Sequence, residues 1–445
     1  MSGLISRRKF IVLSAAGLMS AHPLHRLLAA NIFSAEGAPR RICASYLPDY
    51  SAPWSQSPAR LSRFLSGDHL EFDVGGWFLF GNLREESGKN SGFFMGIQRM
   101  DQDVLGERVP VYQAAIGFNH PELGRYLYGG CDITDLKNIV ITQNPWKVHA
   151  VCPGESPGWM SMELLSGKMG RPNATYLLKA HLTDQYGERL QARVTLRDRM
   201  GAVQHGYGPA SFYPQWLTPL QRSIIRSEFH CSVDAYLQET AAPMKCQGEY
   251  YYSLGLMDVQ RFEIGVGSAS RFAAGNSGTF WMDYCLETLN EAFQSVIKDS
   301  EFVFFALQFP SRREAMMVFQ LDTKTAGRLN VARRYKVDSA TARNGALLPI
   351  VQWDYNKIHI WPLEGTRWKS EETGLTYPMK YFVWLNGPSK AHKGELLLQA
   401  VRHNQELVIE NSVQYQGLYR VQGTLGGEMV RGQAWVEIQP PGHMV

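Results

Sequence analysis

The sequence predicts an all-β fold of barrels or sandwiches, from two observations. First, apolar and polar residues alternate on both sides of Gly-containing turns, in 178–197 and again in 419–438. Alternation with period two is typical of a strand that buries one face. Second, turn signals recur about every ten residues, and strands do not alternate regularly with helices. This argues against Rossmann and TIM architectures.

Other segments refine this prediction. Continuous apolar runs at 302–307 and 316–319 predict strands that are buried on both faces. Apolar residues spaced by three and four positions predict a helix over 284–298, and a second helix candidate lies at 219–239.

The chain length of 445 residues suggests two or three domains. The helix predicted over 284–298 is the best boundary between two β-domains. We therefore expect domains at 39–285 and 286–445, with 286–298 as a linking helix.

The N-terminus carries a paired arginine, Arg7-Arg8, ahead of a short, mildly apolar run. This arrangement resembles a twin-arginine export signal. We expect residues 1–38 to be a signal peptide and leader, the twin-arginine translocase to be a partner, and the protein to work in the periplasm or outside the cell. No later stretch reaches the ~20 apolar residues of a membrane span, so the chain is not expected to cross a membrane.

Composition excludes two classes of protein. Hydrophobic residues make up 44% of the chain and charged residues 19%, which is too apolar for intrinsic disorder. The formal net charge is +4, and Arg7, Arg8, Lys9 and Arg26, within residues 1–35 that hold no acid, account for all of it. The remainder carries no basic field for a nucleic-acid backbone.

Motif searches favour neither a metal site nor a serine nucleophile. The six cysteines form no C-x-x-C and the histidines no H-x-x-x-H cluster, so nothing demands a metal or an organic cofactor. If a disulfide forms after export, Cys231 and Cys246 are the nearest pair in sequence. Residues 154–158 match G-x-S-x-G, but Pro157 follows the serine and lacks the N–H that an oxyanion hole needs.

Two aromatic segments carry the candidate chemistry. Segment 249–253 holds three consecutive tyrosines, and Asp283 ends the run 278–283 beside Trp281. An acid in an apolar run is costly to desolvate, and burial raises its pKa. Such a neutral acid can donate a proton to an alkene or an enol. The residues leave a second interpretation open, in which the aspartate caps a strand end through backbone N–H groups.

Several short segments, in order, resemble a two-domain lipocalin-like family. It includes the carotenoid 1,2-hydratases, kievitone hydratase, fungal lipocalin-like cyclases and exported proteins loosely called secreted hydrolases. The resemblance runs from about residue 70 to 438, and its motifs are GWFLFGNL (76–83), YYS (251–253), WMD (281–283), FFALQ (304–308), WKS (368–370), QEL (405–407), YQG (415–417) and GQAWVE (432–437).

The resemblance implies two calycin-like β-barrels packed side by side, with an apolar pocket at or near their junction. In the hydratases, an acid in a Tyr-x-Asp or Trp-x-Asp motif is tied to proton transfer. That position matches Asp283, with Trp281 as its aromatic partner. The same enzymes place a histidine and an aromatic residue in the strand matching 250–253, where this chain has tyrosines and no histidine nearby in sequence.

Two classes of function follow. An enzyme would act on a lipophilic terpenoid, polyene or polyketide by hydration, isomerisation or cyclisation. Asp283 would donate the proton, Tyr251 or Tyr252 would orient the substrate, and Trp77 and Trp281 would bind it through their rings. A non-catalytic carrier would instead hold a hydrophobic ligand in the same pocket. A hydrolase is the third and disfavoured alternative.

Overall fold

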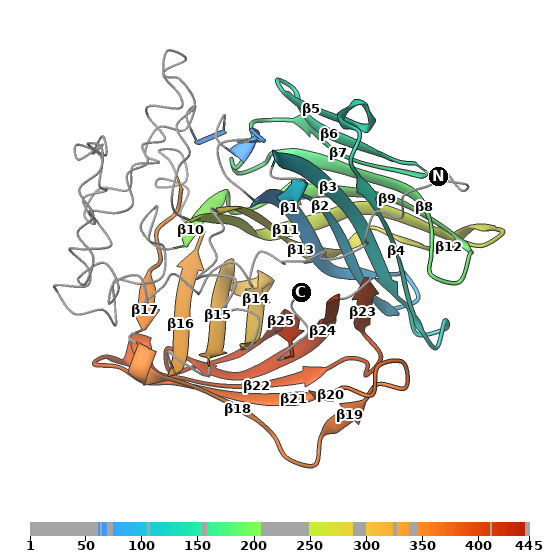
Figure 1. Cartoon of the computed structure of the whole chain (residues 1–445). Helices are drawn as coiled ribbons and strands as arrows, with labels where there is room; N and C mark the ends of the chain where they lie inside the picture. Colours follow the sequence, from blue (N-terminus) through green and yellow to red (C-terminus); the bar gives the residue numbers. More distant parts are fainter. Residues whose placement is uncertain are drawn as a thin grey trace, which may run out of the picture.

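The strands form two large antiparallel sheets, each curled into a nearly closed barrel, and the barrels lie side by side (Figure 1). The all-β, two-barrel prediction is confirmed. The computed structural model describes residues 61–62, 65–68, 74–104, 107–153, 158–205, 249–287, 300–323, 327–337, 346–353, 355–409 and 412–440. Within these ranges no helix is long and apolar enough to cross a membrane.

Several expectations fall on other parts of the chain. The leader at 1–38, the helix candidate at 219–239, the pair Cys231 and Cys246, and residues 154–157 of the G-x-S-x-G motif lie outside the described residues.

The first barrel is built from strands between residues 74 and 287. Along the chain these are β1 (Val74–Arg84), β2 (Asn90–Val104), β3 (Glu107–Asn119), β4 (Tyr126–Ile133), β5 (Ile139–Gln143), β6 (Trp146–Cys152), β7 (Gly158–Ser166), β8 (Thr175–Thr183), β9 (Arg189–Asp198), β10 (Ala202–His205), β11 (Glu249–Val266), β12 (Ala269–Gly275) and β13 (Ser277–Glu287), with the 3-10 helix η3 (Leu136–Asn138) before β5. Their order in the sheet is β4-β3-β2-β1-β13-β11-β9-β8-β7-β6-β5, and β10 and β12 each pair with β11.

The second barrel follows from residue 301. Its elements are β14 (Glu301–Phe309), η5 (Pro310–Arg312), β15 (Glu314–Thr323), β16 (Gly327–Lys336), β17 (Val351–Trp353), η7 (Tyr355–Lys357), β18 (Ile358–Pro362), β19 (Arg367–Lys369), β20 (Thr376–Pro378), β21 (Lys380–Leu385), η8 (Lys390–His392), β22 (Gly394–Ala400), β23 (Glu406–Ile409), β24 (Ser412–Leu425) and β25 (Glu428–Gln439). The sheet order is β17-β16-β15-β14-β25-β24-β22-β21-β18, β23 pairs with β24, and β19 and β20 form a separate two-stranded sheet.

The two predicted hairpins and the two predicted buried strands are confirmed. β8 and β9 form the hairpin predicted over 178–197, and β24 and β25 form the one predicted over 419–438. The apolar runs lie in β14 and β15, which pair with each other and bury both faces.

The prediction of a helix over 284–298 is wrong for its first four residues. Residues 284–287 continue β13, and 288–299 lie outside the described residues. Tyr284 and Leu286 face the interior of the first barrel, whereas Cys285 faces the second barrel. Because both faces of this strand end are buried, its apolar residues do not alternate with polar ones, and a short run of that kind also fits a helix.

Alternation along β1 separates the interior of the first barrel from its contact surface with the second. Trp77 and Leu79 pack inside the first barrel. Phe78 and Phe80 point the other way, into an apolar cluster that also contains Phe304 and other residues of the second barrel. The second barrel has its own separate interior cluster. The region between the barrels is therefore a third core, formed by outward-facing side chains of both sheets.

A disulfide lies where the first barrel closes. β4 and β5 are the two ends of the sheet path, and Cys131 on β4 is bonded to Cys152 on β6. The neighbouring Tyr128 N–H donates to Gln185 Oε1 (2.9 Å), in the turn after β8. The sequence had singled out a different cysteine pair, because proximity along the chain says nothing about which strands meet at a barrel seam.

Hydrogen bonds also fix the two barrels against each other. Gln308 of β14 donates to the carbonyl of Phe280 in β13 (2.6 Å). Arg402 donates to Asn119 Oδ1 (2.8 Å), and Asn119 donates in turn to the carbonyl of Asn404 (2.6 Å). Groups on the facing surfaces are thus held in a defined register.

Candidate active site

Strands β10, β11 and β13 bring three polar side chains together on the face that meets the second barrel. Ser253 lies directly opposite Asp283 in the pairing of β11 with β13. His205, the last residue of β10, lies opposite Tyr251 in the pairing of β10 with β11. Residues 251 and 253 point to the same face because side chains alternate along a strand.

These side chains form a continuous chain of hydrogen bonds. Ser253 Oγ donates to Asp283 Oδ1 (2.5 Å), and the indole N–H of Trp281 donates to the same oxygen. His205 Nε2 lies 2.7 Å from Ser253 Oγ. Because serine has one hydrogen and gives it to Asp283, His205 Nε2 donates to the serine oxygen.

The second barrel completes this chain. The hydroxyl of Tyr335, on β16, lies 2.9 Å from His205 Nδ1 and 2.9 Å from the carbonyl of Gln204. Since Nε2 carries the imidazole hydrogen, Nδ1 and the carbonyl of Gln204 are both acceptors and share the single hydroxyl hydrogen of Tyr335. The polar chain therefore runs from Tyr335 through His205 and Ser253 to Asp283.

Burial raises the pKa of Asp283 to about 7. The side chain is 1% exposed, and loss of hydration disfavours the charged form. Hydrogen bonds from Ser253, Tyr251 and Trp281 act in the opposite direction, because they stabilise the carboxylate. Near neutral pH the group therefore exchanges between acid and carboxylate.

The pKa of His205 is shifted in the opposite direction. Burial lowers its pKa well below the usual value, and the positive charge of Arg333 lowers it further. The imidazole is therefore neutral near pH 7, consistent with one donating and one accepting nitrogen.

A second acid, Glu437, reaches the same region from β25. It is 2% exposed, and burial raises its pKa well above the usual value. The negative charge of Asp283 raises the pKa of Glu437 further, whereas a hydrogen bond with Gln416 lowers it. Each barrel thus contributes one buried acid to their junction, and mutual repulsion favours a protonated form.

Aromatic rings surround the polar chain. The His205 ring lies 4.5 Å from Tyr251 and stacks at 6.0 Å on Trp281, between ring centroids. Trp281 also meets Phe304 of the second barrel edge-on at 6.5 Å. A positive charge that developed on a bound molecule here would lie among aromatic faces, which attract cations.

The residues predicted for the site divide between two faces. Asp283, Tyr251 and Trp281 lie together between the barrels. Tyr252 and Trp77 point to the opposite face and pack inside the first barrel, where Trp77 donates to the carbonyl of Leu65 (2.9 Å). Tyr251 and Tyr252 are consecutive strand residues, so they cannot share one face.

Sequence reasoning missed His205, Tyr335 and Glu437, and it gave Ser253 no role. His205 lies 48 residues before Ser253 and meets it only through strand pairing. It lies on β10, opposite Tyr251, and not in the segment 250–253 of β11 where the resemblance implied a histidine. The one sequence signal for Glu437 was its place in the family-like segment 432–437.

A serine, a histidine and an aspartate in contact do not form a hydrolase triad here. In a triad, the aspartate orients the histidine and the histidine accepts the serine proton. In this protein Ser253 lies between the other two and donates to Asp283. The geometry suits stabilisation of the Asp283 carboxylate rather than activation of a nucleophile.

Comparison with known proteins identifies the fold. No protein-family model and no curated protein sequence matches the chain. Among solved structures, a candidate AttH protein from Nitrosomonas europaea aligns with a TM-score of 0.56 at 15% identity, over 84% of this chain and 94% of that one. Kievitone hydratase from Nectria haematococca aligns with a TM-score of 0.51 at 14% identity, over 85% and 94%. The chain shares their two-barrel fold.

Proposed function

We propose that this protein is an enzyme that protonates a lipophilic small molecule, with Asp283 as the proton donor. The observation that carries the proposal is a buried carboxylic acid with a pKa of about 7, held by side chains among aromatic rings at the junction of two barrels. A general acid works best when its pKa lies near the working pH. The shared fold with a protein named kievitone hydratase supports the same class of chemistry.

The hydrogen bonds suggest how each residue acts. Oδ1 of Asp283 accepts from both Ser253 and Trp281, so the hydrogen of the neutral acid is on Oδ2. Transfer of that proton to an alkene or an enol would leave a carboxylate, which both donors stabilise. The cation then loses a proton to this carboxylate, directly in an isomerisation or cyclisation and from the added water in a hydration, while Ser253 and His205 hold the carboxylate in place. Hydration, isomerisation and cyclisation of a terpenoid, polyene or polyketide can all begin with this step.

The first experiment is mass spectrometry of an organic extract of the protein purified from its native host. A stoichiometric lipophilic compound, or a close relative of it, is then incubated with the protein and with Asp283→Asn. We expect chemical conversion by the wild type alone and retention of the ligand by both. Equal conversion by both proteins would contradict the role of Asp283, and binding without conversion by either would favour a carrier.

We also propose that the protein is exported to the periplasm by the twin-arginine pathway. The Arg7-Arg8 pair supports this, and so does the Cys131–Cys152 disulfide, because disulfides persist mainly in oxidising compartments. Replacing both arginines by lysine should leave the protein in the cytoplasmic fraction. Unchanged recovery from the periplasm would contradict the assignment.

A further inference from the structure

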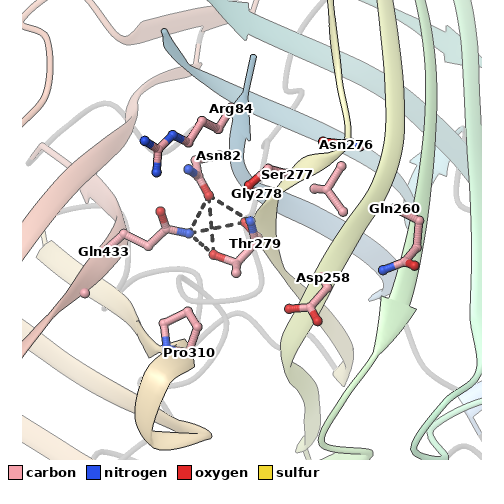
Figure 2. Close-up of a pocket in the computed structure, with 12 residues that line it drawn as sticks. Asn82, Arg84, Asp258, Gln260, Asn276, Ser277, Gly278, Thr279, Pro310 and Gln433 are labelled. Carbon is pink, nitrogen blue, oxygen red and sulfur yellow. Dashed lines mark hydrogen bonds between the residues drawn. The ribbon is translucent and has the colours of Figure 1, made fainter. Parts of the chain in front are cut away.

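A cavity opens at the seam between the barrels, away from the polar chain of Asp283. It has a volume of about 500 Å³ and is lined by β1, β11 and β13 of the first barrel and by Pro310 and β25 of the second (Figure 2). Asp283, Ser253 and His205 are not among its lining residues. Thr279, which lines it, lies four residues before Asp283 on the same face of β13, a separation of roughly 13 Å along a strand. The buried ring of Trp281 stands between them.

One wall of this cavity is fixed by a network that joins the two barrels. The Asn82 side-chain oxygen accepts from the amide of Gln433 (2.5 Å) and from the backbone N–H of Thr279 (2.8 Å). Gln433 also contacts Thr279 Oγ1, and Figure 2 shows these contacts converging from opposite sides. Since the Asn82 oxygen is already occupied, its amide nitrogen is the group left to donate to a ligand.

The two charged side chains of the cavity lining, Arg84 and Asp258, differ in whether they form an ion pair. Arg84, at the end of β1, is exposed and has no carboxylate within ion-pair distance among the described residues. The acid in the lining, Asp258, is paired with Arg199 at 3.4 Å. Arg84 therefore remains as the uncompensated charge in this part of the structure.

The rest of the lining is uncharged and mostly polar. Gln260, Asn276 and Ser277 contribute amide and hydroxyl groups, Val259 and Pro310 are apolar residues, and no aromatic residue lines the cavity. Such a surface suits a hydroxylated molecule rather than the lipophilic substrate proposed for Asp283. A guanidinium binds a carboxylate through two parallel hydrogen bonds.

We propose that this cavity is a binding site for a small hydroxylated carboxylate, separate from the site at Asp283. Arg84 binds the carboxylate, and the amides and hydroxyls bind the hydroxyl groups. The volume lies within the range of about 300–1,000 Å³ that is usual for small-molecule sites.

The test is calorimetric titration of the full-length protein with D-gluconate and, separately, with sorbitol, which has the same carbon chain but no carboxylate. We expect gluconate to bind at millimolar concentration and sorbitol to bind at least ~10-fold more weakly, because the charge-assisted bonds to Arg84 are lost. Absence of gluconate binding, or equal binding of both, overturns the proposal.

Two variants locate the site. Arg84→Gln should weaken gluconate binding at least ~10-fold, whereas Arg193→Gln, on an exposed strand residue outside the cavity, should leave it unchanged. Thermal unfolding of both variants checks that they fold. Gluconate binding that survives Arg84→Gln, or that disappears equally in both folded variants, overturns the assignment of the carboxylate to Arg84.

Discussion

Asp283 and Asp198 are two buried aspartates of the first barrel that differ in what holds them. Neither side chain is more than 1% exposed, and burial raises the pKa of each to about 7. Asp198 Oδ1 accepts the backbone N–H groups of Met200 and Gly201, both at 2.8 Å, in the turn from β9 to β10. Asp283 Oδ1 accepts side-chain donors instead, from Ser253 and Trp281.

The difference shows that a raised pKa alone does not identify an active site. Asp198 is the strand-capping aspartate that the sequence left open as an interpretation of Asp283. Its partners cannot titrate, so a proton on Asp198 has no route along its hydrogen bonds. Asp283 is linked through Ser253 to an imidazole, and it faces the junction of two barrels rather than a turn. The hydrogen-bond partners of a buried acid therefore distinguish a structural acid from a candidate catalytic one.

The sharpest test of this contrast applies one isosteric change to both acids. Asp283→Asn keeps an oxygen for Ser253 and Trp281 but removes the transferable proton. We expect turnover of the substrate to fall by a factor of about 10² to 10⁴, the usual contribution of a general acid. Asp198→Asn keeps an oxygen for its two N–H donors and should change turnover little. A similar loss in both folded variants would show that the contrast is wrong.

Removing the acceptor oxygen of Asp198 should destabilise the turn that follows β9. Asp198→Ala leaves the buried N–H groups of Met200 and Gly201 without their acceptor, which should lower the free energy of unfolding by ~1–3 kcal/mol. Urea unfolding of Asp198→Ala and of Asp198→Asn measures this difference, because the asparagine retains the acceptor. Equal stability of the two variants would mean that the turn does not depend on these bonds.

A smaller effect on turnover is expected at His205, which acts through Ser253. His205→Gln removes the imidazole that bonds both Ser253 and Tyr335, and we expect a loss of roughly 10-fold, about the value of one hydrogen bond. As a positioning residue, it should also change the pH profile of turnover. A variant with reduced turnover and an unaltered profile would instead indicate a purely structural role.

The pH dependence of stability should not distinguish the two acids. An unfolded aspartate loses its proton near pH 3.9, whereas both folded groups keep theirs up to about pH 7. Each therefore makes stability fall as pH rises through that window, and each Asn variant should show a shallower fall in urea midpoint. His205, whose pKa is lowered, contributes the opposite slope below its unfolded pKa, but it is common to all three proteins. If only one Asn variant changes the slope of stability against pH, the pKa of the other aspartate is not raised in the folded protein.

The sequence by itself determined the strands and the type of fold. Period-two alternation in 178–197 and in 419–438 specifies which side chains share a face, and β8–β9 and β24–β25 follow it. The ordered family-like segments indicated two barrels. The same alternation also required Tyr251 and Tyr252 to point apart. The prediction failed at 284–287. Both faces of this strand end are buried, so its apolar run is compatible with a helix as well as with a strand.

Only the tertiary structure decided the composition of the site. Which face of β11 and β13 meets the second barrel depends on how the sheets curl and pack, so Tyr251 joins Asp283 while Tyr252 and Trp77 fill the first barrel. His205, Tyr335 and Glu437 come from three other strands in two different barrels. Burial, which raises the pKa of Asp283 and lowers that of His205, exists only once the barrels meet. The pKa shifts of the site therefore depend on long-range strand pairing, because these groups lose their hydration only when both sheets enclose them.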